Sequence, residues 1–321
     1  PIARICHHHA LKNWNRYATR FAQIAPKMSI NTNKSTPLSI VIPAKNEGRN
    51  LAVLLPDLLR LYKGAEIIVV NDGSTDDTLE VCEQHGITCI TQPYSKGNGA
   101  AVKAGARAAS GTDIVFMDAD LQHDPNDIEG LLEKYRQGYD MVVGARHFSS
   151  HASLGRGLAN RMYNKLASWI VNRKVEDLTS GFRAVNAERF REFLHLLPNG
   201  FSYPTTSTMA FFRAGYSVAY HPIHASKRRG NHQKSHIRPI RDGMRFLLII
   251  FKVGTLYSPL KIFAPISGLH FIVGLGYYVF TYITQERFTN MSALLFTVSI
   301  LVFLIGLISE QITALLYRPG R

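Results

Sequence analysis

Two aspartates and a glutamine follow an apolar run in the middle of the chain, at Asp118, Asp120 and Gln122. In an extended backbone, the side chains at positions i, i+2 and i+4 point to the same side, so this spacing predicts three oxygen ligands facing one site. Carboxylate and amide oxygens suit Mg²⁺ or Mn²⁺ and do not suit zinc. The segment therefore predicts a divalent cation site that water and substrate phosphates would complete.

Three further loops carry groups that can bind a nucleotide. The first is Pro43–Glu47, and the second places Asp72 directly after an apolar run, where a carboxylate can meet a base or a ribose. The third is a glycine-rich turn at Lys96–Ala101, which precedes a predicted helix whose N-terminus would suit an anion. None of the three is a GxGxxG or Walker sequence, so each loop alone is a weak signal.

The elements that must position these loops alternate along the chain. Short apolar runs predict strands and amphipathic segments predict helices, which favours an α/β fold with a mainly parallel sheet and helices on both faces. Functional residues then lie at the carboxyl ends of the strands. Pro56 predicts a kink or a late start in the first helix. The predicted strands cover 38–43, 66–70, 87–91, 113–117 and 141–143, and the predicted helices cover 50–62, 75–85, 99–109 and a segment from residue 125.

The end of the chain contains two long apolar runs, 261–284 and 292–316. Each is long enough to cross a bilayer as a helix and exceeds the usual length of a buried core helix. Over 235–257, apolar and basic residues form two stripes of a predicted helix, which fits a helix in the membrane interface or one packed on the preceding domain. The basic flanks predict that the preceding domain lies on the cytoplasmic side.

The charge of the chain is unevenly distributed. It has 37 Lys plus Arg and 23 Asp plus Glu, a formal net charge of +14, and the excess lies beside the first apolar run and in residues 1–36. This distribution favours phosphates and lipid headgroups as partners over nucleic acid. Three cysteines exclude a disulfide framework. We expect residues 1–36 to be a basic extension that is either disordered or not native before Met28, followed by domains over 37–234, 235–257 and 258–318.

The ordered segments PAKNE, NDGSTDDT, KGNGAA, DADLQ, GAR and LTSGFR resemble those of family 2 glycosyltransferases with the GT-A fold. With the apolar hairpin included, the chain most resembles the polyprenyl-phosphate glycosyltransferases, over residues 38–317. The resemblance implies a GT-A domain followed by an interfacial helix and a two-helix transmembrane hairpin. It also implies a nucleotide-sugar donor, a polyprenyl-phosphate acceptor and Mg²⁺ or Mn²⁺ as cofactor.

The resemblance implies roles for individual residues. It places Asp120 and Gln122 on the metal and Asp118 near both the metal and the ribose. The other nucleotide contacts that it implies are Pro43, Ala44, Asn46, Glu47, Asp72 and Lys96. The residues that it implies at the acceptor phosphate are Arg146, Arg156, Asn160, Arg228, Arg229 and Lys234, although the family's Gly-x-Ser-Lys is replaced here by GNHQKS.

The expected reaction is an in-line transfer that inverts the anomeric centre. A phosphate monoester has a second pKa near ~6, so it is largely dianionic at neutral pH and is already a nucleophile. What it needs is cations that cancel the repulsion between the two phosphates. Arg146 and Arg183 fit that task beside the metal on Asp120. Two alternatives are kept: a processive polysaccharide synthase, in which Asp177 would be the base, and a non-catalytic membrane adaptor. The Gln-x-x-Arg-Trp motif of processive synthases does not occur in the chain.

The sequence leaves the identity of both substrates open. The donor is a UDP-glucose-like sugar or GDP-mannose, and the lipid is undecaprenyl or dolichyl phosphate. We expect a multi-pass protein of the plasma membrane with a cytoplasmic catalytic domain and a role in the cell envelope. Gly268, Gly274 and Gly276 are small enough for close helix packing, which could extend to a homo-oligomer.

Overall fold

The structure, a computed structural model, describes residues 38–146, 154–200, 202–224 and 254–316, without the side chains of 154–160. Several predicted features lie outside these residues. They are the extension over 1–36, the basic residues Arg228, Arg229 and Lys234, the side chains of Arg156 and Asn160, and most of the predicted interfacial helix over 235–257.

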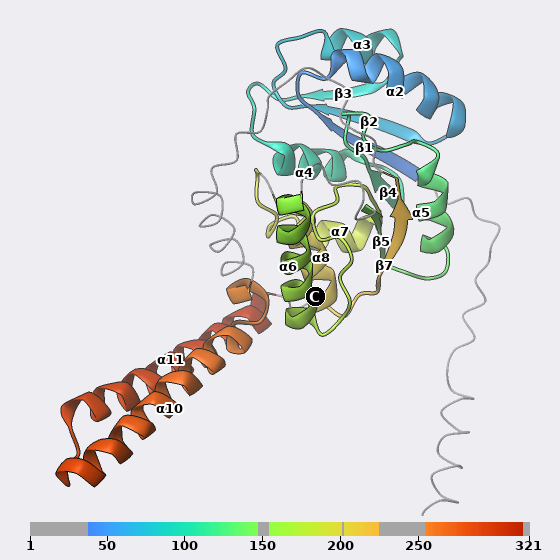
Figure 1. Ribbon diagram of the computed structural model, residues 1–321. Coiled ribbons are helices and arrows are strands. Elements are labelled where there is room, and N and C mark those ends of the chain that lie inside the picture. The colour runs from blue at the N-terminus through green and yellow to red at the C-terminus, as the bar shows by residue number, and fades with distance from the viewer. Residues whose placement is uncertain (1–37, 147–153, 201, 225–253, 317–321) are drawn as a thin grey trace, which may run out of the picture. The chain divides into compact units, whose positions relative to one another are not determined.

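A seven-stranded sheet in the order β3-β2-β1-β4-β6-β5-β7 organises the first part of the chain (Figure 1). Only β6 runs antiparallel to its neighbours β4 and β5, so the predicted mainly parallel α/β sheet is confirmed. Sequence patterns did not predict β6 and β7. The strands are β1 (Leu38–Ala44), β2 (Glu66–Asn71), β3 (Thr88–Thr91), β4 (Asp113–Phe116), β5 (Met141–Arg146), β6 (Arg183–Asn186) and β7 (Val218–Ile223).

Helices cover both faces of the sheet because the central strands are apolar on both sides. In β1, Val41 packs into one buried cluster, whereas Ile40 and Ile42 pack into the other. The helices of the first cluster are α4 (Asn98–Ala108), α6 (Leu154–Val171), α7 (Ala187–Glu192) and α8 (Tyr203–Arg213). Those of the second cluster are α2 (Gly48–Leu61), α3 (Thr78–Gln84) and α5 (Asp127–Tyr135).

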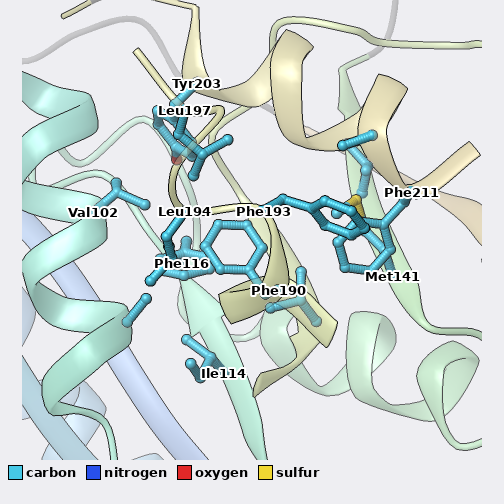
Figure 2. Close-up of a cluster of buried hydrophobic side chains, with 14 of the residues drawn as sticks. Val102, Ile114, Phe116, Met141, Phe190, Phe193, Leu194, Leu197, Tyr203 and Phe211 are labelled. Carbon is cyan, nitrogen blue, oxygen red and sulfur yellow. The ribbon is translucent and has the colours of Figure 1, made fainter. Parts of the chain in front are cut away.

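Aromatic rings in the first cluster fix the end of β4 (Figure 2). Phe116, the last residue of β4, packs against Phe190 of α7 with 4.7 Å between ring centroids, and Tyr203 of α8 lies 6.5 Å away at its edge. Burial of such rings contributes roughly 2–3 kcal/mol each. The strand therefore ends in a rigid setting two residues before Asp118.

Helix α2 begins earlier than the presence of Pro56 predicted. It begins at Gly48 and continues through Pro56 to Leu61, so the predicted late start is wrong. Leu51, Leu54 and Leu58 are buried on one face at helical spacing, while Pro56 faces solvent. Burial of this leucine face outweighs the hydrogen bond that a proline removes from the helix interior.

Two helices of 27 residues each, α10 (Pro259–Gln285) and α11 (Asn290–Leu316), form a hairpin at the end of the described chain. Their mean hydropathies over an 18-residue window are 1.5 and 2.6. At 1.5 Å per residue each helix is about 40 Å long, so both are long and apolar enough to cross a membrane. Most of their large apolar side chains are exposed.

Small residues recur every seven positions where the two helices meet. Ser267 and Ser299 each donate a side-chain hydrogen bond to the other's carbonyl oxygen, at 2.8 and 2.9 Å. The predicted close packing holds for Gly274, but Gly268 and Gly276 have open space beside them and take no part in this contact. The buried small residues are Ser267, Gly274 and Thr281 in α10 and Ser292, Ser299, Gly306 and Thr313 in α11.

A polar group holds the base of the hairpin to the sheet domain. Arg213, at the end of α8, donates to Glu310 of α11 at 2.6 Å, and the backbone amide of Leu260 donates to the same carboxylate at 3.3 Å. A charged residue in an apolar helix is costly without such partners. Glu310 is therefore tolerated because it lies where the hairpin meets the preceding domain.

We predict that Gly306→Val destabilises the hairpin, whereas Gly276→Val does not. A Cβ at Gly306 would lie 2.6 Å from Cβ of Phe263, while a Cβ at Gly276 meets no atom within 4 Å. Overpacking of this kind costs about 1–3 kcal/mol. Thermal unfolding in detergent checks the pair, and equal midpoints for both variants would contradict the packing described here.

Candidate active site

A cavity of about 460 Å³ opens where β1 and β4 lie side by side. The chain passes from β1 to β2 and β3 on one side and returns to β4 on the other, so this is the point where the strand order reverses. Ligands of open α/β sheets bind at such a point, outside the carboxyl ends of the strands. The loops after β1, β2 and β4 all reach the cavity.

The cavity contains most of the residues that the sequence proposed for a nucleotide, together with some that it did not. The predicted residues that line it are Pro43, Ala44, Glu47, Asp72, Asp118 and Asp120, and the additional ones are Lys45, Ser95, Gly97, Asn98, Ala101 and Ala119. Asn46 and Lys96 are absent from this lining. Asn46 instead accepts a hydrogen bond from the Thr75 amide at 2.9 Å, and Lys96 extends over the ring of Tyr94.

Asp72 organises the glycine-rich turn. Its buried carboxylate accepts hydrogen bonds from the Ser95 hydroxyl at 2.8 Å, the Lys96 amide at 2.6 Å and the Gly97 amide at 2.9 Å. Gly97 has φ +101°, a conformation that favours glycine. The carboxylate at the tip of β2 thus sets the shape of the turn that borders the cavity.

The N-terminus of α4 is closed by another part of the chain. The amide of Gly99 donates to the carbonyl of Gly200 at 3.2 Å, and the amide of Ala100 donates to that of Asn199 at 2.8 Å. Gly99 permits this approach, because a Cβ there would lie 2.0 Å from the Pro198 carbonyl oxygen. The prediction of an anion site at this helix start is wrong, since the carbonyl groups already occupy these donors.

Asp118 and Asp120 both reach the cavity, but not because the backbone is extended. Strand β4 ends at Phe116, and Leu121 has φ +59°, so the chain bends after Asp120. The amide of Gln122 donates to the Asp120 carboxylate at 3.2 Å and closes this bend. The premise of the predicted same-side arrangement is therefore wrong, and Gln122 does not line the cavity as the two aspartates do.

Acidic side chains dominate the cavity lining. Among the described residues of the lining, four carboxylates, those of Glu47, Asp72, Asp118 and Asp120, face one lysine, Lys45, which donates to Ser95 at 3.0 Å. No group of three His, Cys, Asp or Glu residues with metal-binding geometry occurs in the described part of the chain. A pair of carboxylates with room for water and substrate oxygens nevertheless fits Mg²⁺ or Mn²⁺, which rarely have all-protein cages.

Arg146, the last residue of β5, is held by a buried partner. Its guanidinium donates to both oxygens of Asp177, at 2.8 and 3.0 Å, and to the Thr179 hydroxyl at 2.6 Å. Burial favours a higher pKa for Asp177, but the hydrogen bonds and charge of Arg146 outweigh it and lower that pKa. A carboxylate with both oxygens bound and a lowered pKa is a poor general base, so the arrangement favours a positioning role for Asp177 over the role of a base.

Arg183 lies in the protein interior and does not face the cavity. Its guanidinium has no exposed surface and donates to the Pro204 carbonyl at 3.1 Å and to the hydroxyls of Ser207 and Thr208 at 2.7 and 3.2 Å. The prediction that it acts on a phosphate is therefore wrong, because a buried side chain bound by the first turns of α8 cannot reach one. Arg183 instead fixes α8 to β6.

Gly181 and His123, to which the sequence assigned no role, lie next to the site. A Cβ at Gly181 would lie 2.8 Å from a carboxylate oxygen of Asp118, so only glycine allows this approach. His123 is buried against the ring of Phe182, with 4.8 Å between centroids, and burial lowers its pKa to about 4. The position of Gly181 and Phe182 within the SGFR segment was the only sequence signal for these contacts.

Comparison with known families gives the same division of the chain. The family model described as glycosyl transferase family 2 matches residues 39–194, which contain the cavity and both aspartates. The chain carries a family 2 glycosyltransferase domain. A second model, described as the GtrB C-terminal hairpin, matches residues 258–315, the segment of α10 and α11.

The relatives of this glycosyltransferase domain include enzymes named for lipid phosphates. A dolichol-phosphate mannosyltransferase of Pyrococcus furiosus is 32% identical over 51% of this chain and 50% of its own length. An undecaprenyl-phosphate 4-deoxy-4-formamido-L-arabinose transferase of Yersinia pestis is 31% identical over 63% of this chain and 64% of its own. The chain thus spans between half and two thirds of these curated relatives.

A solved structure confirms the GT-A fold. Glucosyl-3-phosphoglycerate synthase of Mycobacterium tuberculosis, crystallised with Mn²⁺, UDP and its product, superposes with a TM-score of 0.54. The superposition covers 68% of this chain and 78% of the synthase chain, with 22% sequence identity. At this level of identity, the likeness concerns the fold alone.

We predict that Asp177→Asn lowers the free energy of unfolding at pH 7 by about 2–3 kcal/mol, because it leaves Arg146 without its buried countercharge. Asp177 has a lowered pKa in the folded state, so its contribution is present above its usual pKa of 3.8 and is lost as the pH falls through the folded value. Urea unfolding between pH 7 and pH 3 should show this difference shrinking below about pH 4.

The matched control is Glu176→Gln. Glu176 pairs with Lys174 at 2.8 Å on the surface, so we expect a change below about 0.5 kcal/mol at any of these pH values. Equal destabilisation by both variants would contradict a structural role of the buried pair.

Proposed function

We propose that the protein transfers a sugar from a nucleotide sugar to a polyprenyl phosphate at a membrane surface, with inversion of the anomeric centre. The observation that carries this proposal is the acidic cavity between β1 and β4 in a chain that also has an apolar hairpin. The polyprenyl-phosphate transferases among its relatives support the acceptor class. The proposed donors are a UDP-glucose-like sugar or GDP-mannose.

Asp118 and Asp120 would hold the divalent cation, Mg²⁺ or Mn²⁺, and Gln122 remains a predicted third ligand. When bound, the cation acts as a Lewis acid on the leaving diphosphate. The need for it follows from charge, because a nucleoside diphosphate would enter a cavity whose described lining has four carboxylates and one lysine. That lysine, Lys45, would contact the same diphosphate.

The nucleoside would lie against the loops after β1 and β2. Pro43 and Ala44 present apolar surface there, and Glu47 offers an acceptor. Asp72 contributes by holding the Ser95–Gly97 turn in place through its three hydrogen bonds. The predicted contacts of Asn46 and Lys96 require a side-chain movement from the positions described here.

The acceptor phosphate would approach Arg146. The ion pair with Asp177 fixes this guanidinium. Burial favours a lower pKa for it, but the hydrogen bonds and charge of Asp177, with smaller contributions from the charges of Asp118 and Asp120, outweigh burial and raise that pKa. A phosphate dianion attacks without a general base, which agrees with an Asp177 that has both oxygens occupied. Arg156, Asn160, Arg228, Arg229 and Lys234 remain proposed partners of that phosphate.

The hairpin would cross the plasma membrane, with the catalytic domain on the cytoplasmic side. The basic flanks of the apolar runs support this orientation. Contacts between Arg213 and Glu310 would keep the catalytic domain close to the bilayer, where the acceptor phosphate lies at headgroup level. An acceptor fixed at that level reaches the cavity by lateral diffusion.

A transfer assay in lipid discs tests the proposal. The full chain would receive polyprenyl phosphate, Mn²⁺ or Mg²⁺, and one labelled nucleotide sugar at a time. We expect label in a lipid with a single sugar, and a loss of at least 100-fold on addition of chelator or in Asp120→Asn.

Asp124→Asn is the matched control, because this exposed aspartate is in the same loop but accepts only from Asn126 at 2.9 and 2.7 Å. It should keep near-normal activity. Label in long polymers would favour a processive synthase, and equal activity of both variants would show that Asp120 holds no essential metal.

A further inference from the structure

Helix α6 exposes apolar and basic side chains on one face. Met162 and Trp169 are 64% and 48% exposed, and the exposed Lys165 lies between them. At 100° per residue, these three positions fall within an arc of about 60°. Another face of the same helix packs Tyr163, Ala167 and Ile170 into the core, so the exposed face has no partner within the described part of the chain.

The surroundings of this face are basic. From residue 154 to residue 174 the chain contains five basic residues and no acidic one, and Lys165 and Arg173 are exposed. The exposed Lys174 pairs with Glu176 at 2.8 Å. A tryptophan among lysines and arginines is typical of a surface at the boundary between water and lipid. The combination is unfavourable for contact with a second copy of the same face, because like charges would meet.

The end of α6 is joined to the start of the apolar hairpin. Lys261 donates through Nζ to the carbonyls of Trp169 and Ile170 at 3.1 and 2.7 Å, and to the Asn172 side chain at 2.9 Å. Lys261 is the last charged residue before the long apolar run of α10. The backbone of Trp169 is therefore fixed beside Lys261, where the apolar part of α10 begins.

We propose that this face of α6, defined by Met162, Lys165 and Trp169, docks on the bilayer surface, with Trp169 at the acyl–headgroup boundary and Lys165 on anionic phospholipid headgroups. The proposal rests on the membrane placement of the hairpin in the proposed function. Its consequence is a second, peripheral contact between the catalytic domain and the bilayer. Because α6 packs into the core of the catalytic domain and ends at the hairpin, this contact would fix how the catalytic domain faces the membrane.

The two tryptophans of the chain make the test direct. Trp14 lies in the 1–36 extension, so Trp14→Phe leaves Trp169 as the sole fluorescent reporter. The full-length variant would be placed in discs of phosphatidylglycerol and phosphatidylcholine, with bromine either near the headgroup end or near the middle of the acyl chains. We expect about a twofold loss of Trp169 emission with shallow bromine, a smaller loss with deep bromine, and weak quenching by aqueous acrylamide.

Two matched reporters in the Trp14→Phe/Trp169→Phe background set the scale. Ile272→Trp, on an exposed position about 16 Å along α10 from Lys261, should be quenched by deep bromine, and Leu59→Trp, on the exposed side of α2, should respond only to acrylamide. Quenching at Ile272→Trp without quenching at Trp169 would overturn the docking of α6 alone. No quenching at either position would overturn the membrane placement of the hairpin as well.

A third result separates lipid from protein contact. Protection of Trp169 from acrylamide without quenching by brominated lipid would mean that another protein surface, such as a second copy, covers this face, and it would overturn the proposal. Lys165→Glu provides an independent check. We expect it to reduce shallow quenching of Trp169 in discs rich in phosphatidylglycerol and to change it little in discs of phosphatidylcholine alone.

Discussion

Repulsion between negative charges is the constraint on which the rest of the site depends. Within the part of the chain that the structure describes, the cavity between β1 and β4 is lined by four carboxylates and one lysine, and the proposed donor and acceptor both carry phosphates. Such ligands can meet there only if cations cancel the charge. The chain itself supplies Lys45 and Arg146, and Asp118 with Asp120 offers a place for a divalent ion. The excess of carboxylates thus disfavours binding of a free diphosphate. It favours binding of a diphosphate that is complexed with a divalent cation.

The fold meets this constraint by fixing each charged group through contacts with neighbouring residues. Asp118 follows a strand whose end is fixed by Phe116 and lies against Gly181, Asp177 holds Arg146, and Asp72 holds the turn at Gly97. Groups fixed in this way need little reorganisation when substrate binds, which is the main way a protein stabilises developing charge. The hairpin is held in the same way, because the Arg213–Glu310 pair and Lys261 join the apolar helices to α8 and α6.

The local pattern was enough to predict the parallel core, since β1, β2 and β4 are apolar on both faces and bounded by turns. It also located the two aspartates and the apolar hairpin. What it missed depends on contacts between residues far apart in sequence. The carbonyls of residues 199 and 200 close the start of α4, and the hydroxyls of α8 bury Arg183, neither of which leaves a periodic signal. The bend at Leu121 was missed because an extended backbone was assumed beyond the true end of β4.

The most direct test of the central claim is a crystal structure of the protein with Mn²⁺ and a nucleoside diphosphate, using anomalous scattering to locate the metal. We predict an anomalous peak at bonding distance from Asp120, bridged to the diphosphate, with the nucleoside against Pro43 and Ala44 and Lys45 near a phosphate. Asp120→Asn should lose the peak. A diphosphate bound in this cavity without metal, or a metal bound away from Asp118 and Asp120, would contradict the account of a charge conflict resolved at the end of β4.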